Sequence, residues 1–78
     1  MNKTITILVD NDSWILPHAR ILEEHLISMN FDAKLVRSAQ EIRDGWVCFL
    51  LGCVHIVKDQ YLKLNKHNLV VHESDLPK

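Results

Sequence analysis

The sequence predicts an α/β domain built on an open, all-parallel sheet. Short apolar segments alternate with helical segments along the chain, and one of the apolar segments is hydrophobic throughout, which is typical of a strand covered on both faces. Right-handed crossovers would set the four predicted strands in the order 2-1-3-4, as a partial Rossmann-like sheet. Ligands of such sheets bind at the carboxyl ends of the strands, so the residues that follow each strand are the candidate site residues.

Composition indicates one small soluble domain spanning 1–78. The 78 residues are 47% hydrophobic and 24% charged, with a net charge of -1 and charges of both signs interspersed, so nucleic acid is not an expected partner. The opening TITILV run lacks a cleavage site, and the longest apolar stretch, 46–54, is far shorter than the roughly 20 residues that span a bilayer. We therefore expect a cytoplasmic protein with no membrane partner.

The first strand and the helix after it are the clearest elements. Threonine and isoleucine alternate over 4–9, before turn residues beginning at Asp10 end the strand. Ser13 is the expected N-cap of a long amphipathic helix with Pro17 in its first turn. Apolar residues recur there at spacings of three and four, and these predict the buried side of the helix: Ile15, Ala19, Leu22, Leu26 and Met29.

The rest of the chain predicts three more strands. A short strand over 33–37 leads to Ser38, which can cap a brief helical segment that carries Ile42 and ends at Gly45. The continuous run WVCFLL, Trp46 to Leu51, should lie in the middle of the sheet. A short crossover helix is expected before the fourth strand, with apolar positions at Val57, Tyr61, Leu62 and Leu64. The fourth strand is expected over 68–71, as a buried run that delivers His72 to the end of the sheet.

Three residues therefore follow strands at one edge of the predicted sheet: Asp10, Gly52 and His72. Asp10 either contacts substrate or bonds the backbone of its own turn. Gly52 either allows a ligand to approach the backbone or only suits a tight turn. His72 is the candidate catalytic residue, because an imidazole exchanges protons near neutral pH.

Several other chemistries are excluded or disfavoured. Gly45 and Gly52 are the only glycines, so neither a GxGxxG turn nor a Walker-type loop can be built. CxxC and HExxH motifs are absent, and we expect no metal site. Cys48 and Cys53 would lie roughly 16 Å apart along an extended strand, against a disulfide limit near 7 Å, so both should be free thiols. His55 is expected to be a surface residue.

The tail VVHESDLPK resembles the HxSLLP signature of the folate-dependent formyltransferases, a family that includes methionyl-tRNA formyltransferase and the amino-sugar N-formyltransferases. His72, Ser74, Leu76 and Pro77 match that pattern. FLLGCVHIV is similar to the family's strand and glycine-containing turn, and ILVDNDSWILPHARILEEHL is similar to its first strand and helix in a divergent subgroup.

The resemblance implies transfer of a formyl group from N10-formyltetrahydrofolate to a primary amine. His72 would assist attack by the amine and stabilise the oxyanion. The folate pocket would be lined by two groups of residues, namely Ser74, Asp75, Leu76 and Pro77 on one side and Leu50, Leu51 and Gly52 on the other. The acceptor would be a small-molecule amine, and the lack of a basic patch favours an amino-sugar nucleotide over tRNA.

Two positions differ from the family pattern. The family carries an asparagine two residues before its histidine, where this chain has Val70, and Asn68 lies four before. The family's orienting aspartate would lie beyond Lys78, so we expect an amino-terminal fragment of a formyltransferase that is inactive by itself. The alternative is a self-contained, flavodoxin-like binding or interaction module without catalysis. In either case the unpaired edge at 69–71 predicts self-association.

Overall fold

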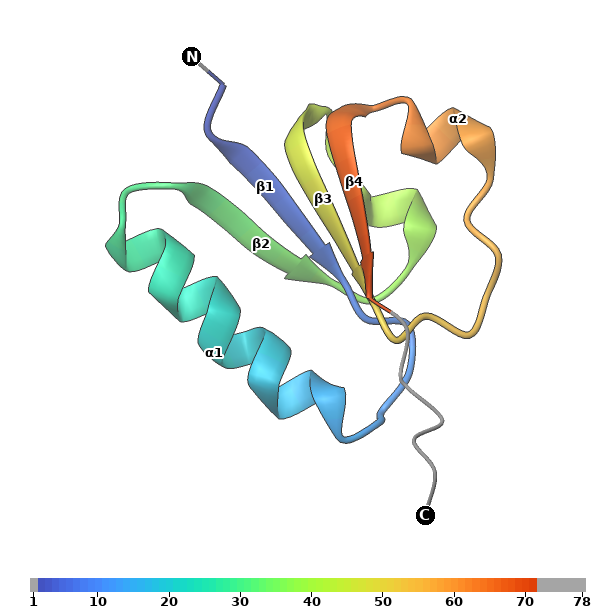
Figure 1. Cartoon of the computed structure of the whole chain (residues 1–78), viewed down its shortest axis with the longest axis horizontal. Coiled ribbons are helices and arrows are strands. Elements are labelled where there is room, and N and C mark those ends of the chain that lie inside the picture. Colours follow the sequence, from blue (N-terminus) through green and yellow to red (C-terminus); the bar gives the residue numbers. More distant parts are fainter. Residues whose placement is uncertain (1, 72–78) are drawn as a thin grey trace.

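The computed structural model describes residues 2–71 and contains one four-stranded, all-parallel sheet in the order β2-β1-β3-β4 (Figure 1). The fold class, strand direction and strand order predicted from the sequence are confirmed. The strands are β1 (Thr4–Leu8), β2 (Asp32–Val36), β3 (Gly45–Leu51) and β4 (Asn65–Val71). No helix among these residues is long and apolar enough to cross a membrane.

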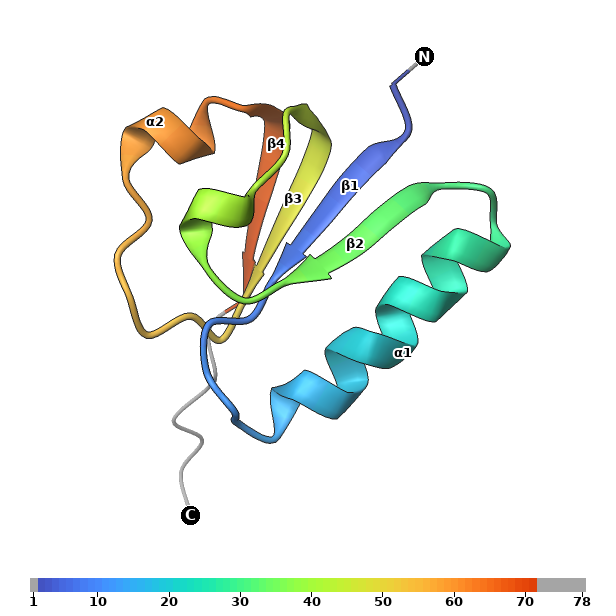
Figure 2. The same ribbon diagram turned by 180° about the vertical axis from the view of Figure 1, so that it is seen from behind.

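Helical segments lie on both faces of the sheet. Helix α1 (Ile15–Ser28) lies on one face, and the 3-10 turn η1 (Ala39–Glu41) and helix α2 (Asp59–Leu62) lie on the other (Figure 2). Neighbouring residues of β1 therefore belong to different cores: Ile7, 0% exposed, packs on the α1 side, and Leu8, 1% exposed, packs on the α2 side. β3 is buried or half-buried along its whole length, as its continuous apolar run predicts.

Helix α1 differs from the prediction at both ends. Ser13 is not its N-cap, because Trp14 already has helical φ and ψ and the Ser13 hydroxyl makes no capping bond. The Ser13 carbonyl oxygen instead accepts a hydrogen bond from the Leu16 N–H at 3.1 Å. Met29 was expected to be buried but is 53% exposed, because the helix ends at Ser28 and Asn30, with φ 70°, turns the chain away.

The second half of the chain follows the prediction more closely. Ser38 and Glu41 form a capping box around η1, and Ile42 is buried beneath it. α2 is a single turn of four residues. β4 begins three residues earlier than expected, and the Gly45 N–H donates to the Leu64 carbonyl oxygen at 2.9 Å just before it starts.

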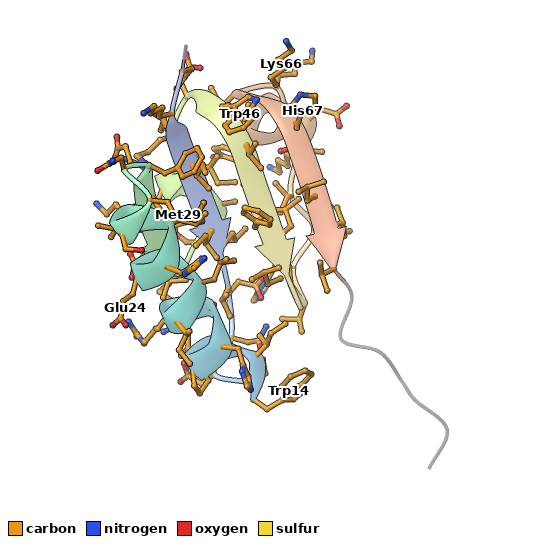
Figure 3. The ribbon with its side chains drawn as sticks, turned by 60° about the vertical axis from the view of Figure 1, so that its left-hand side comes forward. Trp14, Glu24, Met29, Trp46, Lys66 and His67 are labelled. Carbon is orange, nitrogen blue, oxygen red and sulfur yellow. The ribbon has the colours of Figure 1, made fainter. Side chains whose placement is uncertain are left out.

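The carboxyl half of β4 is exposed, although its apolar sequence predicted a buried strand. Leu69, Val70 and Val71 are 48%, 56% and 47% exposed. β4 is an edge strand, and α1 lies over the β1 and β2 side, so no helix covers β4 on that face (Figure 3). Burial of a strand depends on its neighbours, which an apolar run does not specify.

Gly45 is required at the start of β3, and Gly45→Ala should destabilise the fold by about 2–3 kcal/mol through overpacking. A Cβ there would lie 2.7 Å from the Thr4 carbonyl oxygen and 2.9 Å from the Thr4 Cβ, neither of which can rotate away. Urea denaturation measures the loss. Gly52→Ala is the control substitution. Gly52 has a left-handed φ of 59°, and placing an alanine in that conformation should lower the stability by only about 1–2 kcal/mol. Wild-type stability of Gly45→Ala would contradict the expectation.

Candidate functional site

The loops after β1 and β3 meet at the carboxyl edge of the sheet. Oδ1 of Asp10 accepts hydrogen bonds from the Val54 N–H at 3.0 Å and from Asn11 Nδ2 at 2.8 Å. Oδ2 accepts the His55 N–H at 2.9 Å and lies 3.0 Å from His55 Nδ1. Asn11 Nδ2 also donates to the Gly52 carbonyl oxygen at 2.8 Å. The structure thus brings Asp10 and Gly52 together, as the strand order predicts.

Asp10 is a buried carboxylate. Its side chain is 7% exposed, and burial alone would raise its pKa, but the hydrogen bonds from Val54, Asn11 and His55 outweigh burial and lower the pKa to about 2. Asp10 is therefore ionised at neutral pH, and both of its oxygens are occupied. In this arrangement it fixes the 52–55 loop, which borders two cavities.

The larger cavity has a volume of about 330 Å³ and lies between the carboxyl ends of the strands and the η1 and α2 side of the sheet. Its polar lining residues are Asp10, Arg37, Ser38, Gln40, His55, Lys58 and Tyr61. Arg37 is held in place, since its Nε donates to the Val9 carbonyl oxygen at 2.8 Å and its Nη2 bonds Asp12. Lys58 makes no ion pair with any other residue of 2–71. Arg37 is thus paired with Asp12 and Asp10 adds a carboxylate to the lining, so Lys58 is the cation that could meet a negatively charged ligand.

The smaller cavity has a volume of about 210 Å³ and is mainly apolar. It lies between the ends of β3 and β4 and the segment that leads to α2, and its lining includes Leu50, Cys53, Val57, Leu62, Val70 and Val71. His55 borders both cavities. Burial, reinforced by the charge of Asp10, raises the pKa of the Cys53 thiol to about 11, so Cys53 remains protonated and contributes an apolar surface.

The candidate residues from the sequence fall into three groups. Leu50 lines the smaller cavity, and Gly52 forms a left-handed turn above it. Leu51 faces the α1 side and packs in that core, so it does not line this cavity. His72, Ser74, Asp75, Leu76 and Pro77 lie outside the described residues.

Asn68 does not lie at the edge where an oxyanion donor would be needed. Its Nδ2 donates to the Leu62 carbonyl oxygen at 2.8 Å, in the middle of β4, and its Oδ1 is buried. The amide therefore joins β4 to α2. Both free cysteines are as expected, and Cys48 is fully buried.

Several lining residues were not anticipated from the sequence. Arg37 and Ser38 directly follow β2, so the rule that selected Asp10 and Gly52 also applies to them. Lys58 and Tyr61 do not follow a strand, so this rule does not select them. They line the larger cavity because of the course that the 53–58 segment takes. Asp10 fixes the start of that segment through Val54 and His55.

Within residues 2–71, no group of three or more side chains is placed to hold a metal ion. Comparisons with protein-family models, curated proteins and solved structures find no match to this chain.

Proposed function

We propose that this chain forms the amino-terminal part of a folate-dependent formyltransferase, which moves a formyl group from N10-formyltetrahydrofolate to a primary amine. The observation that carries the proposal is the apolar cavity at the ends of β3 and β4. Val70 and Val71 line it, and the HESDLP segment follows them directly in the sequence. By itself the chain would bind the donor without catalysing transfer.

The cavity suits the ring system of a folate. Leu50, Val57 and Val70 offer apolar walls for a flat heterocycle, and the His55 side chain adds a polar group to the lining. A position at the carboxyl ends of parallel strands is where ligands of open α/β sheets bind. The fold and the motif thus favour the same edge.

The larger cavity supports an acceptor amine that carries phosphate. Arg37 and Lys58 lie beside it, and Tyr61 adds an aromatic surface. A nucleotide-linked amino sugar has both a primary amine and a diphosphate, and the diphosphate would give Lys58 an ionic partner. We therefore propose an amino-sugar nucleotide as the acceptor.

In the proposed reaction the amine nitrogen attacks the formyl carbon, and the bond from that carbon to N10 of the folate breaks. The proton that leaves the amine passes to N10. His72 would hold this proton or donate a hydrogen bond to the oxyanion of the tetrahedral intermediate. Val70, at the position of the family asparagine, supplies no side-chain donor.

Calorimetric titration with a stable N10-formyl folate analogue tests the proposal. Val70→Glu should weaken binding at least tenfold, because it places a charge at the apolar wall. Leu69→Glu is the matched control, since Leu69 is similarly exposed but pairs with Phe49 and lies on the opposite face of the sheet. Absence of binding by the wild-type chain at millimolar analogue, or equal losses in both variants, would contradict the proposal.

A further inference from the structure

We propose that the outer edge of β4 is a self-association site, at which two copies pair their β4 strands antiparallel about a two-fold axis. The backbone at this edge is open. The Gly52 N–H donates to the Val71 carbonyl oxygen at 2.8 Å, so Val71 points its backbone groups towards β3. Because alternate residues of a parallel ladder face the same neighbour, Leu69 does the same, while Asn68 and Val70 point outward. The N–H groups of those two residues meet no acceptor among residues 2–71.

The opposite edge of the sheet is partly closed by side chains. The Asp32 N–H donates to the Lys3 carbonyl oxygen on the β1 side, so the backbone groups of Leu35 and Arg37 point outward. Each of those outward N–H groups is occupied by a carboxylate: Glu23 accepts from Leu35 at 2.7 Å, and Glu41 accepts from Arg37 at 3.0 Å. Pairing of β4 with β2 of another copy would have to displace these two carboxylates. Pairing of β4 with β4 displaces no such group, and it closes as a dimer and does not extend into a fibre.

Charge favours the antiparallel arrangement. The basic residues of β4, Lys66 and His67, lie at its amino end, and the carboxyl half from Asn68 onward is uncharged (Figure 3). A two-fold axis through Leu69 keeps the two copies of Lys66 at opposite ends of the interface. Asn68 then exchanges hydrogen bonds with the partner's Val70, and Leu69 packs against the partner's Leu69.

The interface is small, which determines how the dimer behaves. Stable dimers bury about 800 Å² per partner, and one strand of seven residues offers less. We therefore expect a dissociation constant on the order of 10–1000 μM, with monomer and dimer in exchange. The proposal differs from the formyltransferase proposal in its contacts, because it uses the outward backbone groups of β4 and not the side chains that line the cavities.

Sedimentation equilibrium from 10 μM to 1 mM tests the association. The wild-type chain should shift from monomer to dimer, and Val70→Pro should remain monomeric at every concentration with an unchanged circular dichroism spectrum. Proline lacks the outward N–H, and edge strands accept it where that group faces solvent. A wild-type chain that stays monomeric at 1 mM, or a Val70→Pro variant that still dimerises, would overturn the proposal.

Disulfide trapping tests the register, in a Cys53→Ala background that leaves only the fully buried Cys48. Opposed residues in a non-hydrogen-bonded antiparallel pair have Cα atoms about 4.5 Å apart, within disulfide range. Leu69→Cys should therefore cross-link most of the protein under mild oxidation. Val70→Cys, which is offset from its copy by two residues, should cross-link less than a tenth as much. Equal cross-linking, or none at Leu69→Cys, would rule out this axis.

Discussion

Replacing His72 by alanine is expected to lower the rate of formyl transfer about 100- to 1000-fold in the protein encoded by the complete reading frame. The imidazole would exchange a proton with the attacking amine or bond the oxyanion, and removal of one such group in other enzymes has effects of this size. With Val70 in place of the family asparagine, less remains to compensate for its loss.

The matched control is His67→Ala. His67 is an exposed histidine of β4 that pairs with Val47 near the amino end of the strand and lies away from both cavities. The rate is measured as consumption of the formyl donor with an amine that the wild-type protein formylates. A His72→Ala protein that keeps more than a tenth of the wild-type rate, or a wild-type protein that transfers no formyl group, would contradict the proposal.

Replacing Asp10 by alanine is expected to lower the free energy of unfolding by about 3 kcal/mol. The substitution leaves the N–H groups of Val54 and His55 without their acceptor and removes the charge that they stabilise. Asp12→Ala is the control. Asp12 is 84% exposed in its ion pair with Arg37, so its loss should change the unfolding free energy by less than about 1 kcal/mol. Similar losses in the two variants would show that the Asp10 contacts do not stabilise the loop.

Acid should reproduce part of the Asp10 effect. The folded-state pKa of Asp10 lies near 2, below its ordinary value of 3.8, so its contribution to stability is present above pH 4 and is lost as pH falls towards 2. The difference between wild type and Asp10→Ala should therefore shrink by about 2 kcal/mol over this interval. Chemical denaturation at several pH values measures it, and a difference that does not change with pH would be inconsistent with the lowered pKa.

The strand order was predictable because it depends on general rules. Alternating elements and right-handed crossovers leave few arrangements, and the continuous apolar run at Trp46 to Leu51 identified a strand covered on both faces. Ser13 was predicted wrongly as a cap because the sequence does not reveal that Trp14 is already helical. Residue type restricts capping, but backbone angles decide it.

The candidate site was only partly predictable, for a different reason. The rule that ligands bind beyond strand ends selected Asp10 and Gly52, which the structure brings together. It could not find the bonds from Asp10 to Val54 and His55, because these residues lie more than 40 positions away in the sequence. Those bonds place His55 at the border of both cavities.

The central claim is that the carboxyl edge of β3 and β4 binds a formyl folate, and amide chemical shifts of the 15N-labelled chain test it most directly. Titration with the N10-formyl analogue should give saturable shifts at the amides of residues that line the smaller cavity, namely Leu50, Cys53, Val57, Val70 and Val71. Gly45 and Lys66, at the opposite end of the same strands, should not move. An unchanged spectrum at millimolar analogue, or shifts centred on Gly45 and Lys66, would contradict it.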